Sequence, residues 1–148
     1  MRRSTSRSGS LAAESVFVFD SCALIAILED EPGAGVVEEL LQEPAHRCLL
    51  HAVNACEVYY DLSRRGNTAD ADTLEAIFAE YGLELIETLP PDLWRIAGKL
   101  KAEWRRVALA DCFALALAIQ EEGTLVTSDH RELDRLAEAG VCPILFIR

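Results

Sequence analysis

Hydrophobic residues along this chain fall into two alternating patterns. Short β-branched and aromatic runs predict strands at 16–19, 48–53, 83–89, 124–127 and 143–147. Apolar residues at helical spacing, bounded by proline, glycine or a capping residue, predict helices at 21–29, 32–43, 54–65, 68–81, 92–106, 111–122 and 129–139. Each strand except the last is therefore followed by one or two helices.

This alternation predicts an α/β fold: a three-layer α/β/α sandwich with a central parallel sheet of four to five strands. Parallel neighbours need long crossover connections, and helical crossovers cover both faces of the sheet. The length of 148 residues corresponds to about one domain. We expect a flexible N-terminal arm at 1–14, which is basic and serine-rich, followed by one domain over 15–148.

Composition narrows the class of protein. Hydrophobic residues make up 51% of the chain, enough for a core without metal or disulfide staples. The five cysteines are odd in number and lack the spacing of a zinc site, so reduced thiols and a cytoplasmic location are expected. The longest apolar runs are far shorter than the roughly 18 residues of a membrane span.

The net charge of -11 argues against bulk electrostatic coating of nucleic acid or anionic membrane. Segment 90–110 is the exception, because five basic residues outnumber two acidic ones there. This basic segment leads directly into Asp111. It is either a set of phosphate-binding cations beside an acidic site or an ordinary solvated helix face.

Acidic residues stand where the predicted strands end. Asp20 follows the first strand, Glu57 lies shortly after the second, and Asp129 follows the fourth; Asp111 opens the most apolar helix. Each has a purely structural interpretation. The three aspartates are suitable helix N-caps, and Asn54 with Glu57 matches a capping box.

Taken together, these acids indicate a metal site. Ligands of open parallel sheets bind beyond the carboxyl ends of the strands, and four carboxylates gathered there would repel one another. A divalent cation relieves that repulsion. Oxygen ligands without cysteine or histidine favour Mg²⁺ or Mn²⁺, the ions of phosphoryl chemistry.

The sequence resembles the PIN-domain family, and within it the VapC-type toxin ribonucleases. The resemblance is carried by four segments that occur in the family's order and span the chain from residue 16 onward: VFVFDSCALIAIL, NACEVYYDLSRRG, LADCFALALAIQEEGTLVTSDHRELDRL and PILFIR. By position, it implies an acidic quartet that binds one or two Mg²⁺ or Mn²⁺ ions, formed by Asp20, Glu57, Asp111 and Asp129.

The resemblance also implies supporting polar groups around the quartet, at Ser21, Asn54 and Thr127. Two positions depart from the pattern of many relatives. Cys22 replaces a hydroxyl residue, which weakens or removes a hydrogen bond to the first aspartate. Glu132 stands near a position where relatives carry an acid or asparagine, and it either takes that role or faces solvent.

These observations predict a metal-dependent endoribonuclease that hydrolyses RNA as the toxin of a toxin–antitoxin module. Its expected partners are a small antitoxin protein and a second copy of the chain, with no membrane association. The antitoxin is expected in a hydrophobic groove between the helices at 21–43 and those at 54–81. Two alternatives remain open: a small-molecule phosphohydrolase using the same acids, or a non-catalytic interaction module whose acids only cap helices.

Overall fold

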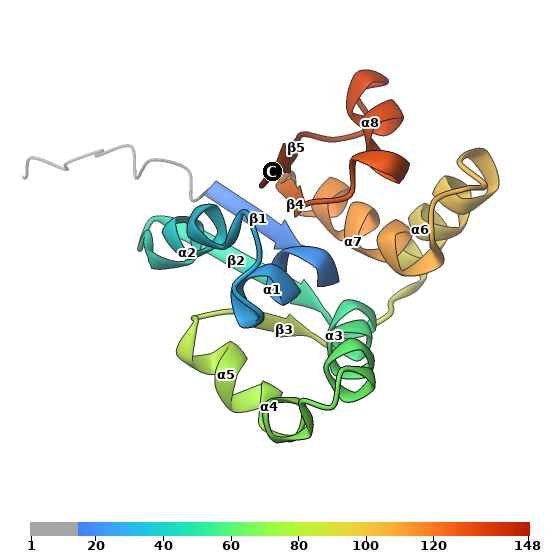
Figure 1. The fold of residues 1–148 in the computed structure, drawn as a ribbon. Coiled ribbons are helices and arrows are strands. Elements are labelled where there is room, and N and C mark those ends of the chain that lie inside the picture. Colours follow the sequence, from blue (N-terminus) through green and yellow to red (C-terminus); the bar gives the residue numbers. More distant parts are fainter. Residues whose placement is uncertain (1–14) are drawn as a thin grey trace, which may run out of the picture.

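A computed structural model of the protein describes residues 15–148, so the predicted arm at 1–14 lies outside the described residues. The described chain forms a five-stranded, all-parallel sheet in the order β3-β2-β1-β4-β5 (Figure 1). The strands are β1 (Ser15–Phe19), β2 (His46–His51), β3 (Glu84–Ile86), β4 (Thr124–Thr127) and β5 (Ile144–Phe146). The predicted α/β fold with a parallel sheet is confirmed.

Helices cover both faces of the sheet. They are α1 (Ser21–Leu28), α2 (Ala34–Gln42), α3 (Ala52–Arg64), α4 (Thr68–Asp72), α5 (Leu74–Glu80), α6 (Pro91–Glu103), α7 (Leu109–Gln120) and α8 (His130–Glu138). Helices α6, α7 and α8 share one hydrophobic core with the sheet, and α1 to α5 share the other. Within residues 15–148, no helix is long and apolar enough to cross a membrane.

Side chains of the central strands alternate between the two cores. Val18 and Leu125 point to the side of α6, α7 and α8, whereas Phe19 and Val126 point to the side of α1 to α5. All four side chains are fully buried. This explains why the strands read as continuous hydrophobic runs instead of alternating ones, as expected for a sheet covered on both faces.

Helix α7 is the most deeply buried helix. Every residue from Ala114 to Ala118 is buried, and α7 contacts α3, α6 and strands β1, β2 and β4. Alternating alanine and leucine let the helix pack closely on the sheet while still filling its core. A helix held on several sides has little freedom to shift, so its first turn, which carries Asp111, is fixed relative to β1 and β4.

Several predicted helix boundaries are wrong, among them the end of the helix predicted at 92–106, which stops at Glu103. The helix predicted to start at Asn54 begins at Ala52, because the His51 ring accepts a hydrogen bond from the Val53 amide at 3.1 Å and caps it. The helix predicted at 68–81 is divided at Thr73. Helix α2 starts after Pro32, and α7 starts before Asp111.

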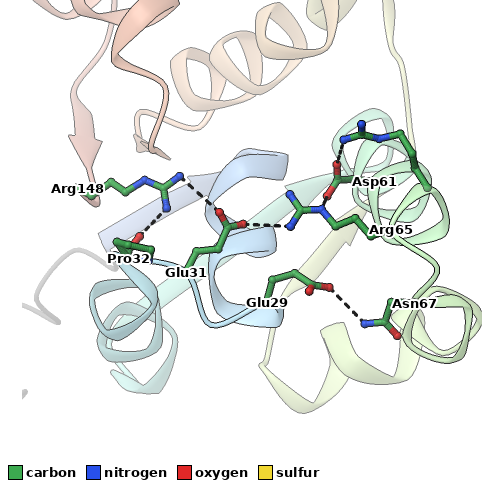
Figure 2. Close-up of polar contacts among 8 residues, drawn as sticks. Glu29, Glu31, Pro32, Asp61, Arg65, Asn67 and Arg148 are labelled. Atoms are coloured by element: carbon green, nitrogen blue, oxygen red, sulfur yellow. Dashed lines mark hydrogen bonds and ion pairs between the residues drawn. The ribbon is translucent and has the colours of Figure 1, made fainter.

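Ion pairs tie the end of the chain to the α1–α2 connection and to α3 (Figure 2). Arg148 donates to the Pro32 carbonyl at 2.8 Å and pairs with Glu31, which also pairs with Arg65. Arg65 in turn pairs with Asp61 at 2.7 Å. Exposed pairs contribute at most about 1 kcal/mol each, so this network mainly orients the segments.

Gly33 fixes the close approach of α2 to the end of the sheet. Its φ of 97° is left-handed, and an added Cβ would lie 2.8 Å from the Ile147 carbonyl oxygen. We predict that Gly33→Ala lowers the free energy of unfolding by at least about 2 kcal/mol in urea titrations. The control is Gly35→Ala, because a Cβ added at Gly35 would have no atom within 4 Å. This variant should leave the free energy of unfolding unchanged or slightly higher. Equal stability of the two variants would contradict this account.

Candidate metal centre

Two of the predicted acids meet where the strand order reverses. From β1 the chain proceeds to β2 and β3 on one side, and β4 and β5 lie on the other; sheets of this kind bind ligands in the crevice beyond the strand ends at the reversal, here β1 and β4. Asp20 follows β1 directly, and Asp129 follows shortly after β4. Both are helix N-caps as predicted: Asp20 accepts from the Ala23 amide at 3.0 Å, and Asp129 from the Glu132 amide at 3.2 Å.

The structural interpretations of the other two acids are wrong. Asp111 is not an N-cap, because α7 begins two residues earlier with Ala108 in the capping position. Asn54 and Glu57 form no capping box, because α3 begins at Ala52 and both residues lie within it. Capping therefore does not explain Asp111 or Glu57, and each is free for another role.

Glu132 joins the acidic cluster. One carboxylate oxygen from each of Asp111, Asp129 and Glu132 lies within 4.8 Å of the others. Glu132 is held there because its Oε2 accepts from the Ala108 amide at 3.1 Å. Its side chain therefore does not merely face solvent, while its backbone amide donates to the Asp129 cap. Asp20 and Glu57, expected in the quartet, lie outside this closest group and act on it through their charge.

Asp20 is fully buried, and one of its two carboxylate oxygens lacks a partner. Burial raises the pKa of Asp20 to about 7, against the opposing effects of the Thr127 hydroxyl and the Ala23 amide. Its Oδ2 has no hydrogen-bond partner among the described residues. A buried carboxylate oxygen without a donor is costly, and a bound cation would satisfy it.

The pKa values of Asp111 and Glu57 are also raised. Burial, the charge of Asp20 and a hydrogen bond with Glu132 together raise the pKa of Asp111 well above its usual range. Burial also raises the pKa of Glu57, while a hydrogen bond from Ser21 Oγ to Glu57 Oε1 at 3.2 Å opposes it. In the absence of a cation, ionisation of these carboxyl groups therefore costs free energy.

The predicted supporting residues connect the elements that carry the acids. Thr127 Oγ1 accepts from the Asp129 amide at 3.0 Å, and Asn54 Nδ2 donates to the Ala110 carbonyl beside Asp111. Together with the Ser21–Glu57 bond, these contacts link α1 to α3, α3 to α7, and the end of β4 to α8. Sequence reasoning missed the Ala108 amide, which no side-chain pattern indicates.

Cys22 lies beside the cluster as a neutral thiol. Burial, followed by the charges of Asp20, Asp111 and Asp129, raises the pKa of Cys22 to about 12. Only the thiolate binds metal well, so Cys22 is a poor ligand at neutral pH. The available donors are then carboxylate oxygens, which fit a hard cation such as Mg²⁺ or Mn²⁺.

A second feature is a groove on the side of α3, α4 and α5. It encloses about 380 Å³ and includes the apolar residues Tyr59, Leu74, Phe78 and Leu85. No residue of 21–43 lines it, so this groove does not lie between the two sets of helices, where the sequence predicts one. Helix α1 uses its apolar residues in the core instead.

Comparison with known proteins is consistent with this arrangement. Residues 17–139 match the sequence profile of the PIN domain. No curated protein matches the sequence significantly.

Similar solved structures include a toxin–antitoxin complex from Klebsiella pneumoniae (TM-score 0.65, 18% identity, covering 88% of this chain and 97% of that one). VapBC2 from Rickettsia felis bound to a promoter DNA fragment gives a TM-score of 0.67 at 18% identity, covering 88% and 98%. FitAcB from Neisseria gonorrhoeae gives 0.62 at 15% identity, covering 88% and 97%. At these identities the likeness concerns the fold.

Removing two of the repelling charges should stabilise the metal-free protein. We predict that Asp20→Asn/Asp129→Asn, which keeps both caps, raises the free energy of unfolding in EDTA at pH 8 by about 1–3 kcal/mol. Wild type should lose stability as pH rises from about 4 through 7, because the folded pKa of Asp20 is raised and its ionised form is disfavoured.

Millimolar Mn²⁺ should raise the Tm of wild type and of the control Asp30→Asn, whose side chain is exposed and outside the cluster. The double variant should not respond. An equal Mn²⁺ response in all three proteins would contradict the assignment.

Proposed function

This chain belongs to the PIN domain family, and on that premise we propose that it is a Mg²⁺- or Mn²⁺-dependent endoribonuclease and the toxin of a toxin–antitoxin pair. Residues 15–148 would form its single nuclease domain. The observation that carries the proposal is the convergence of Asp111, Asp129 and Glu132 beside the buried, unsatisfied Asp20. Helix capping alone does not require that convergence.

Asp20, Asp111 and Asp129 would hold the cation, with Glu132 completing the set. When bound, the ion supplies positive charge for the scissile phosphate and for the leaving oxygen of an in-line displacement. The backbone amides of Ala23, Glu132 and Ala108 keep the carboxylates oriented by their hydrogen bonds. Such fixed orientation lowers the cost of arranging the site during the reaction.

Glu57 is placed to handle the proton of the attacking water. Ser21 occupies its Oε1, which leaves Oε2 to accept. Its raised pKa brings the carboxylate closer to the working pH, which favours proton transfer. Glu57 would therefore act as positioning group and proton acceptor on the α3 side of the crevice.

The small-molecule phosphohydrolase alternative uses the same acids. The polymer substrate is favoured because the basic segment 90–110 ends in Arg105 and Arg106, just before Asp111, where a polyanion would need cations. A monoester such as p-nitrophenyl phosphate separates the two possibilities. Turnover of that monoester without RNA cleavage would favour the alternative.

The antitoxin part of the proposal rests on the groove of α3, α4 and α5. Tyr59 is 48% exposed at its edge, and apolar grooves between helices capture amphipathic helices of partners. Similar structures were solved as complexes of toxins with antitoxins. We also propose a homodimer through other helices, which the exposed Trp94 and Leu109 outside the groove support.

Asp111→Asn should abolish metal-dependent RNA cleavage while leaving the fold intact. The change removes one ligand charge but keeps the side-chain shape, so a loss of at least about 100-fold in rate is expected. Cleavage of total RNA with Mn²⁺ and with EDTA measures the effect, and circular dichroism checks the fold. Asp30→Asn should cleave like wild type. Undiminished cleavage by folded Asp111→Asn would refute the proposed active site.

Cys56→Arg should release the toxin from its antitoxin. Cys56 is exposed in the groove, so the arginine would obstruct an inserted helix without disturbing the core. We expect growth arrest despite co-expressed antitoxin, with RNA cleavage in vitro unchanged. The control is Tyr60→Arg, which lies one turn along the same helix and outside the groove. The co-expressed antitoxin should still neutralise this variant. Full neutralisation of Cys56→Arg would place the antitoxin elsewhere.

A further inference from the structure

A cavity of about 390 Å³ lies directly beside the acidic cluster, and four arginines line it. Arg105 and Arg106 come from the connection between α6 and α7, and Arg131 and Arg135 come from α8. Glu132 belongs to both the cavity and the carboxylate group. The cationic cavity and the acidic cluster are therefore contiguous.

The four arginine side chains have no ion pair or hydrogen bond within residues 15–148. Arg47, Arg64, Arg65 and Arg148, in contrast, all pair with carboxylates. In a chain of net charge -11, unpaired cations gathered in one cavity are unexpected. Glu103 and Glu132 also line the cavity, but neither pairs with any of the four arginines, so a bound anion would supply the missing partner.

The cavity is built on a fixed framework. Lys101 Nζ donates to the carbonyls of Arg105 and Val107 at 2.7 and 2.8 Å, and the Val107 amide donates to the Trp104 carbonyl at 3.0 Å. Trp104 lines the cavity and is held in place because it also packs against the core. An aromatic ring among cations is the composition that binds single-stranded nucleic acid through its phosphates and bases.

We propose that this cavity binds the RNA strand next to the scissile bond, with the arginines on the phosphate that neighbours the one at the acidic cluster. The proposal rests on the endoribonuclease function. It assigns these arginines as positioning residues, which determine where a polymer lies and are not needed for a monoester. Arginine suits this role because its planar fork binds phosphate oxygens in pairs.

The test measures binding without cleavage. A fluorescein-labelled single-stranded RNA is titrated in EDTA with wild type, with Arg105→Gln/Arg131→Gln, and with the control Arg95→Gln/Lys99→Gln. The control removes equal charge from exposed positions of α6 outside the cavity. We expect the cavity variant to lose affinity about tenfold or more, and the slope of log K against log salt to fall by about 1 to 1.5. The control should stay within about twofold of wild type.

With Mn²⁺ the cavity variant should show a raised KM and a nearly unchanged kcat. Equal RNA affinity and salt dependence in the two variants, while wild type cleaves RNA, would overturn this inference and leave the proposed function standing. Poly-glutamate, a polyanion without phosphates, is titrated in the same way. If the cavity variant loses affinity for poly-glutamate but keeps its affinity for RNA, the inference is overturned and the cavity is assigned to an acidic protein partner. Cavity-dependent RNA binding without any cleavage by wild type would refute the nuclease proposal and leave the cavity as an RNA-binding site only.

Discussion

Repulsion among carboxylates held in one crevice is the constraint on which the rest of this structure depends. Asp20 is fully buried with one oxygen unpartnered, and Asp111 lies near it with a pKa raised by burial and by the charge of Asp20. Such an arrangement costs folding free energy when the groups are ionised. The fold maintains it because the elements that carry the acids are fixed by packing that does not involve the acids.

That packing begins with the sheet. Fully buried Phe19 and Val126 are paired at the ends of β1 and β4, and α7, which packs on these two strands, carries Asp111 in its first turn. Helix α8 adds Glu132 through the cap of Asp129. The acidic site and the adjoining arginine cavity are therefore built from the same two segments, α8 and the connection between α6 and α7. Both depend on the relative position of these segments, which the hydrogen bond from the Ala108 amide to Glu132 helps to fix.

The hydrophobic pattern predicts the parallel sheet and most helices because burial on both faces leaves continuous apolar strands. It also places Asp20 and Asp129 correctly, since a residue that ends a strand and caps a helix is visible in the sequence. Glu132 and the start of α3 are harder to predict. The position of Glu132 depends on the Ala108 amide, which is distant in the sequence. The start of α3 depends on the His51 ring as a cap, and histidine is not a recognisable capping signal.

Anomalous diffraction from crystals soaked in Mn²⁺ tests the central claim most directly, because it locates the cation independently of activity. The account predicts one or two strong peaks among the carboxylates of Asp20, Asp111, Asp129 and Glu132. Absence of Mn²⁺ from this crevice at a concentration that supports RNA cleavage, or binding only at exposed acids elsewhere, would contradict it.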